Sequence, residues 1–99
     1  MGLAAHQEEI IAQLYREMYR KLVVYAENAL NDSLAEEAVQ DTFRIACSKY
    51  DELMNSSNPQ GWLMNTLKNV IRNIRKEQAN LNKYFVMTMA LDDEEFMEV

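Results

Sequence analysis

The sequence predicts an all-α fold, a small bundle of a few helices around one core. Only two glycines and one proline occur among 99 residues, which leaves few of the turns that a β fold needs. Apolar residues recur at intervals of three and four through three long stretches, which is the period of an amphipathic helix. Hydrophobic residues make up 48% of the chain and charged residues 26%, as in a globular domain. A chain of this length forms one domain with a single core.

A long amphipathic helix is predicted over residues 7–30. Glu17 and Lys21 lie one turn apart on its outer face and are expected to form an ion pair. Tyr15 and Tyr19 are also one turn apart, and we expect them to cover the edge of the core rather than hold a ligand. The stripe expected to face the core comprises Ile10, Ile11, Leu14, Tyr15, Met18, Leu22, Tyr25, Ala26, Ala29 and Leu30.

Asn31-Asp32-Ser33 is predicted to break the first helix and to start a second, which should end within residues 48–51. Ser33 with Glu36 three residues later forms a capping-box pattern, and Asp32 is the alternative cap. One side of this helix carries small and apolar residues, which we expect to face the core, and the opposite side is polar. The inward residues are Ala35, Ala38, Val39, Thr42, Phe43 and Ala46, and the outward ones are Glu37, Gln40, Asp41 and Arg44.

A third helix is predicted from Pro59, after the polar connection of residues 55–58, to about Glu77. Its residues fall into three groups around the helix axis: an apolar seam, a cationic stripe, and a flank of amides with an indole. The seam is Leu63, Leu67, Val70, Ile71 and Ile74; the stripe is Lys68, Arg72 and Arg75, with Asn65 and Lys76 at its margin; the flank is Trp62, Asn69 and Asn73.

The stretch after Glu77 fits neither the helical nor the strand period cleanly. It either continues as a helix to about residue 90 or forms an irregular segment packed back on the bundle. The acidic residues Asp92 to Glu95 are typical of a solvated linker or tail. We therefore expect a helical domain over residues 1–90 and an acidic linker start or tail over residues 91–99.

The distribution of charge matters more than its total. The formal net charge is -6, yet residues 62–83 hold five basic side chains against the single acid Glu77. That local field is what a nucleic-acid strand would experience. A cationic stripe edged by amides and an indole suits phosphates and unstacked bases. A cationic stripe opposite an apolar seam is also typical of a helix face that is merely solvated. Periodicity alone does not distinguish such a face from a nucleic-acid-binding surface.

No constellation of residues indicates an enzyme, a cofactor or a metal site. The chain has one histidine, one cysteine and no glycine-rich phosphate loop. Cys47 is expected to pack against the core, and a single cysteine excludes an internal disulfide, which fits a reducing cytoplasm. No apolar run is long enough to span a membrane, and the first nine residues are too polar for a signal peptide.

Two segments resemble a known family, the sigma-70-type factors of bacterial RNA polymerase and above all their extracytoplasmic-function group. Residues 35–43, A-E-E-A-V-Q-D-T-F, resemble the A-E-D-L-V-Q-E-T-F signature of region 2. Pro59, Trp62 and Leu63, followed by Asn69 and Arg75, resemble that region's W-L-x-x-I-A-x-N-x-x-x-D-x-x-R segment. The two motifs occur in the family's order, and with the first helix they cover residues 8–78.

The resemblance implies the all-α sigma region 2 bundle, acting in transcription initiation. The second helix would bind the clamp helices of the polymerase beta-prime subunit. The third helix and the loop before it would recognise the promoter minus-ten element and hold its melted non-template strand. The implied core-binding residues are Glu37, Gln40, Asp41 and Arg44. The implied DNA-binding residues are Lys68, Arg72, Arg75 and Lys76 at phosphates, and Ser57, Asn58, Trp62, Asn65 and Asn69 near bases.

The sequence departs from the family pattern at several positions. Glu37 replaces Asp, Ala38 and Arg44 replace Leu, and Asn73 stands where Asp is common. Thr66-Leu67 replaces Ile-Ala, which leaves the promoter preference open. The helix-turn-helix module that reads the minus-thirty-five element does not follow, so we expect an isolated region 2 or a truncated factor. An anti-sigma factor is a further candidate partner. The alternative function is a small acidic helical interaction or regulatory module without DNA binding.

Overall fold

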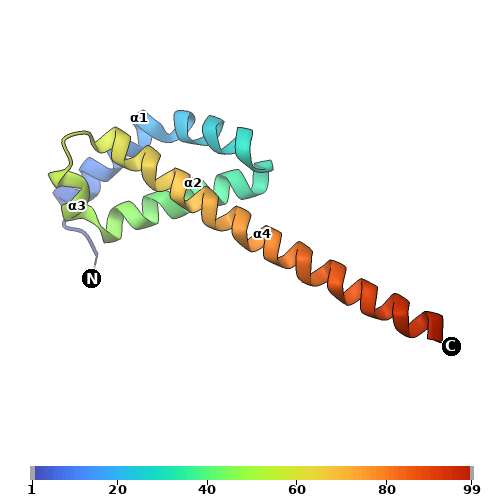
Figure 1. Ribbon diagram of the computed structural model, residues 1–99. Coiled ribbons are helices and arrows are strands. Elements are labelled where there is room, and N and C mark those ends of the chain that lie inside the picture. Colours follow the sequence, from blue (N-terminus) through green and yellow to red (C-terminus); the bar gives the residue numbers. More distant parts are fainter. Residues whose placement is uncertain (1, 99) are drawn as a thin grey trace.

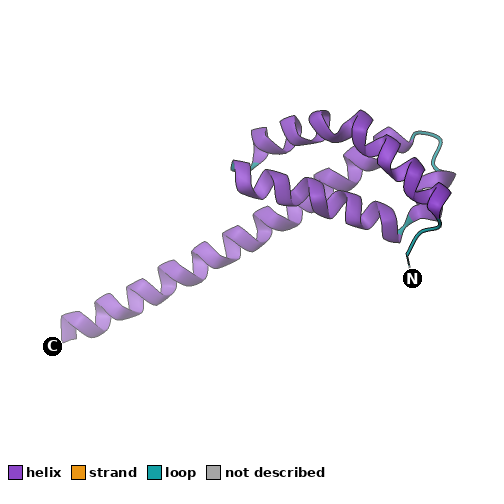
Figure 2. Ribbon diagram, turned by 180° about the vertical axis from the view of Figure 1, so that it is seen from behind, coloured by secondary structure: helices purple, strands orange, loops and turns teal. Residues whose placement is uncertain are grey.

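The described residues of the computed structural model form four helices. The backbone is described over residues 2–98 and the side chains over residues 2–88. Three helices pack into a bundle with the first half of the fourth, whose second half projects away from it (Figure 1). The view from behind shows the short connections at the ends of the bundle (Figure 2). The helices are α1 (Ala5–Ala29), α2 (Asp32–Ser48), α3 (Tyr50–Asn55) and α4 (Pro59–Glu98).

The core forms where the predicted apolar stripes meet. Leu22 of α1, Val39 of α2 and Leu53 of α3 are fully buried together with Leu63 and Leu67 of α4. Small side chains on the facing sides of α1 and α2 allow the two helices to approach closely. The buried alanines are Ala26, Ala35, Ala38 and Ala46. The all-α bundle and the inward faces of the second and third predicted helices are therefore confirmed.

Most of the predicted inward stripe of α1 lies in or against the core, with differences at its edges. Tyr15 packs on Tyr19 and on Phe43, with ring centroids 4.9 and 4.8 Å apart, so these tyrosines do cover the core edge. Tyr25 was expected to face inward, but it is 40% exposed, because it borders the open groove between α1 and α4.

The predicted ion pair between Glu17 and Lys21 is wrong. The Glu17 carboxylate instead accepts hydrogen bonds from Gln13 Nε2 at 2.9 Å and from Gln60 Nε2 at 3.4 Å. The second bond joins α1 to the first turn of α4. A partner on another helix therefore replaces the one that helical spacing within α1 suggested.

The cap of α2 is Asn31, not Ser33 or Asp32. Asn31 has extended backbone angles, φ -69° and ψ 167°, and its side chain accepts a hydrogen bond from the Leu34 backbone N–H at 2.9 Å. Asp32 and Ser33 are already helical. Asparagine is as good a cap as aspartate or serine, so the residue at which the backbone turns helical decides among the three.

The short helix α3 was not predicted. Lys49 interrupts the helical path after Ser48, with ψ at 37°, and α3 then returns Leu53 to the core. No glycine or proline marks this kink in the sequence. The expected end of α2 within residues 48–51 is confirmed, and the polar connection before Pro59 begins only after Asn55.

Cys47 is exposed, so the prediction that it packs against the core is wrong. The preceding residue, Ala46, is the last buried position of α2. Cys47 lies about 100° further around the helix, in an open hollow that it shares with Leu3, two residues before α1 begins. The core does not extend that far around the end of α2.

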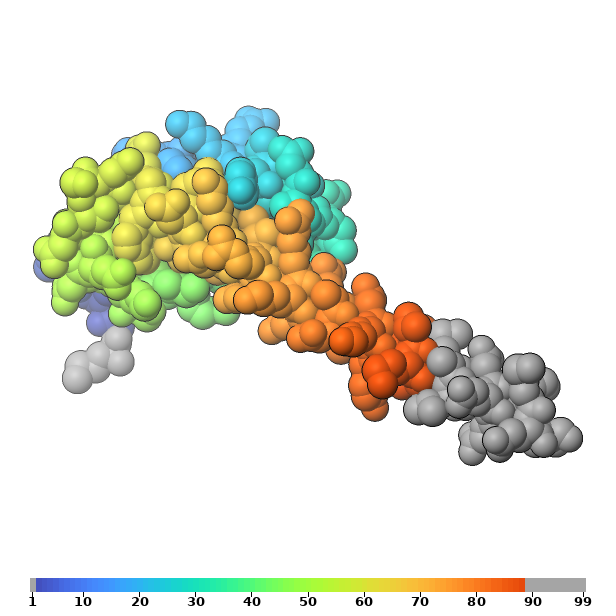
Figure 3. All heavy atoms as spheres, in the orientation of Figure 1, coloured from blue at the N-terminus to red at the C-terminus, as the bar shows by residue number. Residues whose placement is uncertain are grey.

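The segment after Glu77 continues α4 as a helix, and the alternative of an irregular segment packed back on the bundle is wrong. The helix runs to Glu98, beyond the expected end near residue 90. Residues 91–98, expected to begin a linker or tail, thus belong to α4, although their side chains lie outside the described part. On the side of the molecule seen in Figure 3, no other element lies over the coloured part of the projecting helix. Its apolar side chains Leu81, Tyr84, Phe85, Val86 and Met87 are exposed.

Replacing Asn31 tests the cap of α2. Asn31→Ala removes the acceptor of the Leu34 N–H and should lower the free energy of unfolding by about 1 kcal/mol. Ser33 is the cap that the capping-box pattern predicted. Ser33→Ala should change the free energy of unfolding by less than about 0.5 kcal/mol, because Ser33 is an exposed residue inside the helix. Urea denaturation of both variants measures the difference, and an equal loss in the two would contradict the assignment.

Candidate functional site

Four basic side chains form a cationic face on α4: Lys68, Arg72, Arg75 and Lys76. All four are exposed, because the seam that includes Leu67 and Ile71 on the same helix takes up the side buried in the core. The face borders an open groove of about 430 Å³ between α1 and α4, whose α1 side is formed by Tyr25 and Ala29. The predicted cationic stripe is thus exposed and lies next to a second helix.

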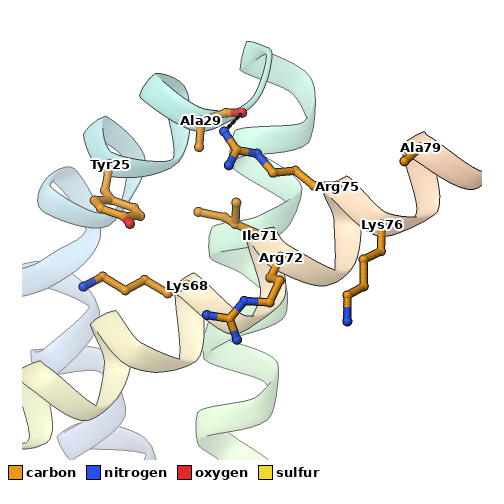
Figure 4. A pocket seen from close by; sticks show the side chains of 8 residues that line it. All are labelled: Tyr25, Ala29, Lys68, Ile71, Arg72, Arg75, Lys76 and Ala79. Atoms are coloured by element: carbon orange, nitrogen blue, oxygen red, sulfur yellow. Dashed lines mark hydrogen bonds between the residues drawn. The ribbon is translucent and has the colours of Figure 1, made fainter.

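Two of the four cations also contact α1. The Lys68 ammonium lies 5.6 Å from the centroid of the Tyr25 ring, within the range of a cation–π interaction. Arg75 Nη2 donates a hydrogen bond to the Ala29 carbonyl at 3.2 Å, at the last residue of α1, where a cation also complements the helix dipole. Figure 4 shows Arg75 reaching toward α1, while Lys76 extends away from it. Arg75 therefore has a structural role beside any role in binding.

The indole and amides of α4 gather on the other flank of the helix. Trp62, Asn65, Asn69 and Asn73 line a shallow hollow of about 320 Å³ with residues from the end of α2 and from α3. We call this surface the indole–amide face. Its indole is half-buried, and Trp62 Nε1 lies 3.5 Å from Glu52 Oε1 of α3. Trp62, Asn69 and Asn73 share one flank, as helical spacing predicted, but Asn65, predicted at the margin of the cationic stripe, lies on this flank instead. The contribution of α3 to this surface was not predicted.

One hydrogen bond joins the indole–amide face to the cationic face. Arg72 Nη1 donates to Asn69 Oδ1 at 3.1 Å, so the Asn69 amide nitrogen remains a donor on the outer side. The bond sets the guanidinium beside the amide on one turn of α4. A strand lying along this helix would meet charge and amide groups at adjacent positions.

The loop before α4 is held by Asn58, which is the cap of the helix. Asn58 Oδ1 accepts from the Gly61 N–H at 3.0 Å, and Ser56 Oγ accepts from the Asn58 N–H at 3.1 Å. Pro59 takes the first helical position, where its missing N–H costs nothing. A Cβ on Gly61 would lie 2.6 Å from Asn58 Nδ2, so the turn favours glycine there. Of the predicted loop contacts, Ser57 is exposed, whereas the Asn58 oxygen is already occupied.

The outward residues of α2 form a separate acid–amide face: Glu37, Gln40, Asp41 and Arg44. Glu37, Gln40 and Arg44 are exposed, as predicted, and Asp41 is partly buried. The Arg44 guanidinium pairs with the Asp41 carboxylate one turn earlier. Such a surface pair contributes only a few tenths of a kcal/mol, so its main effect is to orient the Arg44 side chain.

Within the described residues, little else indicates chemistry. The pKa of Tyr15 is raised above its ordinary value, first by burial and then by the neighbouring Tyr19 and Glu36, so this phenol stays protonated near neutral pH. Histidine, cysteine and acidic side chains in this part of the chain do not gather in threes that could hold a metal ion. Its helices also include none that is long and apolar enough to cross a bilayer.

Comparisons with protein-family models, with curated proteins and with solved structures found no match for this chain.

Arg72 and Arg75 differ in what they should contribute to stability. Arg75→Ala removes the hydrogen bond to the Ala29 carbonyl and should lower the free energy of unfolding by about 1 kcal/mol. Arg72→Ala, the matched control, removes only a surface bond to Asn69 and should cost less than about 0.5 kcal/mol. Thermal and urea unfolding of both variants measure this. Equal stability of the two would show that the contact with α1 contributes nothing.

Proposed function

We propose that this chain is a transcription initiation module similar to region 2 of sigma-70-type factors. It would bind the RNA polymerase core through α2 and the opened minus-ten element through α4. The observation that carries the proposal is that two helices packed in one core present exposed faces of unlike character. Gln40 stands in the acid–amide face and Arg72 in the cationic face, and both are exposed. The ordered motifs at residues 35–43 and 59–75 support the same assignment.

The polymerase side of the proposal rests on the acid–amide face. Glu37 and Arg44 supply opposite charges, and the Gln40 amide between them offers both donors and an acceptor. A coiled coil such as the beta-prime clamp helices displays alternating charges along its flanks, which suits a mixed face of this kind. Electrostatic complementarity then sets the orientation of binding.

The DNA side rests on the two flanks of α4. Lys68, Arg72 and Lys76 would neutralise phosphates of the non-template strand, while Trp62 and Asn69 would meet bases at the indole–amide face. Separating and flipping a base costs a few kcal/mol, and stacking on an aromatic ring returns about 1–3 kcal/mol per base. The bond between Arg72 and Asn69 would keep phosphate and base contacts in register.

A factor of this kind acts in the cytoplasm without a cofactor or a reaction of its own. An anti-sigma factor would be a further partner, since it could cover either face. Its binding would compete with polymerase at the acid–amide face or with DNA at the cationic face.

A second candidate function is a helical protein-interaction module that does not bind DNA. The exposed apolar side chains of the projecting half of α4, such as Leu81 at 68% and Tyr84 at 73% exposure, favour it, because exposed apolar clusters mark protein contacts. This alternative requires neither the clamp helices nor a promoter strand as partners. Binding of the chain to both the clamp helices and a promoter strand would exclude this alternative.

Polymerase binding should depend on Gln40. Gln40→Ala should weaken binding to the isolated beta-prime clamp coiled coil by about tenfold, as for a residue near the centre of an interface. Gln78→Ala, an exposed glutamine on α4, is the matched control and should bind as the unaltered chain does. Isothermal titration with the clamp peptide measures both. Failure of the unaltered chain to bind the peptide would refute the polymerase assignment.

Strand binding should depend on Arg72 and on salt. Arg72→Ala should weaken binding to a labelled single-stranded minus-ten oligonucleotide in the presence of polymerase core. It should also reduce the slope of log K against log salt by about 0.7, the value for one lost phosphate contact on a single strand. Arg20→Ala, an exposed arginine of α1 outside the cationic face, should leave the slope unchanged. Equal slopes for all three proteins would contradict the phosphate role.

A further inference from the structure

A pattern of residues on the first half of α4 recurs on its projecting half. Asn69 and Arg72, which are joined by a hydrogen bond of 3.1 Å, are followed 11 positions later by Asn80 and Lys83. Eleven residues make three turns of an α-helix and about 20° more. Because α4 is one continuous helix, the second amide and the second cation lie on the same side as the first pair, about 16 Å further along the axis.

An aromatic ring accompanies the second pair, as the indole accompanies the first. Trp62 and Tyr84 are 22 positions apart, twice the same interval, so they lie within about 40° of each other around the axis. The Tyr84 side chain is 73% exposed, and Asn80 and Lys83 are exposed as well. We call Asn80, Lys83 and Tyr84 the outer subsite. An open ring beside a cation and an amide is a combination that binds unstacked bases and their phosphates.

The charges around the outer subsite suit a polyanion. Residues 62–88 contain a single acidic side chain, Glu77. Glu77 follows the buried Val70 at an interval of seven, so it lies on the seam side of α4 and away from the cations. Phe85 continues the seam side, about 160° from Lys83 around the axis. A strand that binds the outer subsite therefore meets no carboxylate on its own side of this part of α4 and leaves Phe85 uncovered.

We propose that the outer subsite binds single-stranded DNA, as a continuation of the strand held by the cationic and indole–amide faces. The Tyr84 ring stacks on one base, the Lys83 ammonium pairs with a phosphate, and the Asn80 amide donates a hydrogen bond to the strand. About five phosphates of a strand at B-form spacing span the 16 Å between the two sites. The projecting half of α4 thus lengthens the stretch of strand that the chain holds.

This inference rests on the proposed binding of an opened promoter strand, and it adds contacts outside the segment that resembles sigma region 2. The resemblance ends at residue 78, whereas the outer subsite begins at Asn80. Loss of the outer subsite would shorten the strand contact and leave the contacts of Arg72 and Asn69 in place. The two proposals can therefore fail separately.

Two neighbouring aromatic residues test the stacking role. The probe is a labelled single strand with the minus-ten element and about ten further nucleotides on each side, about twice the span between the two sites. Tyr84→Ala should weaken binding about tenfold, the loss expected for one stacked base, and Tyr84→Phe should retain it. Phe85→Ala, the matched control, removes another exposed ring from the same turn and should leave binding unchanged. Fluorescence anisotropy, with and without polymerase core, measures all four proteins.

The salt dependence tests the phosphate contact of Lys83. Lys83→Ala should reduce the slope of log K against log salt by about 0.7, the value for one phosphate on a single strand. The double variant Arg72→Ala/Lys83→Ala should reduce the slope by about 1.4, because the two cations meet different phosphates. Arg20→Ala, on the exposed side of α1, should leave it unchanged.

Strands that each lack one base locate the contact of Tyr84. Removing the base that stacks on Tyr84 should weaken binding of the unaltered chain about tenfold. The same strand should cost the Tyr84→Ala variant nothing further, because the ring that the base contacted is already absent. Equal losses for the two proteins at every position would overturn the stacking role.

The outcomes separate the outer subsite from the proposed function. Unchanged binding by Tyr84→Ala, an equal loss with Phe85→Ala, or an unchanged slope with Lys83→Ala would each overturn the outer subsite. If these variants bind normally while Arg72→Ala is weakened, only the outer subsite fails. If the unaltered chain binds no strand, with or without polymerase core, both proposals fail. Circular dichroism shows whether each variant keeps the helix content of the unaltered chain.

Discussion

The burial of one seam of α4 is the constraint on which the rest of the structure depends. Leu63 and Leu67 are fully buried, and Val70 and Ile71 nearly so, which fixes the rotation of α4 about its own axis. Each residue of an α-helix turns by about 100°, so every other side chain on these turns then has a set direction. The cations fall on the flank toward α1 and the indole and amides on the flank toward α2 and α3. Neither face could move without exposing the seam.

The parts of the fold that follow from periodicity could be predicted from the sequence. The inward stripes of α2 and α4 are regular. Residues outside these stripes, including Gln40 and Arg72, must therefore lie on the outer sides of the two helices. Boundaries were harder, because Asn31, Asp32 and Ser33 are all good caps and local sequence does not say which one precedes the first helical turn. The kink at Lys49 carries no glycine or proline, so α3 left no signal. Cys47 was wrongly predicted to be buried, because the buried stripe of α2 ends at Ala46, and the sequence does not show where the neighbouring helices stop covering it.

Contacts between helices account for what the sequence could not show at the candidate site. Arg75 donates to Ala29, which is 46 positions away, and Gln60 donates to Glu17, which is 43 positions away. Spacing rules within one helix contain no information about such partners. The cationic face was correctly predicted as exposed, but the division between Arg75, which also supports α1, and Arg72, which does not, required the packed structure.

The continuity of α4 also explains how an acidic chain keeps a usable cationic surface. On a flexible tail, the five carboxylates after residue 91 could fold back and neutralise Lys68, Arg72 and Lys76. As part of the same helix they are held about 25 Å along the axis from the nearest of these cations. Exposed charges at physiological ionic strength are screened over about 8 Å, so the acidic end scarcely weakens the field at the groove. A net charge of -6 and a local attraction for polyanions are therefore compatible, because the continuous helix α4 places the acidic end several screening lengths from the cationic face.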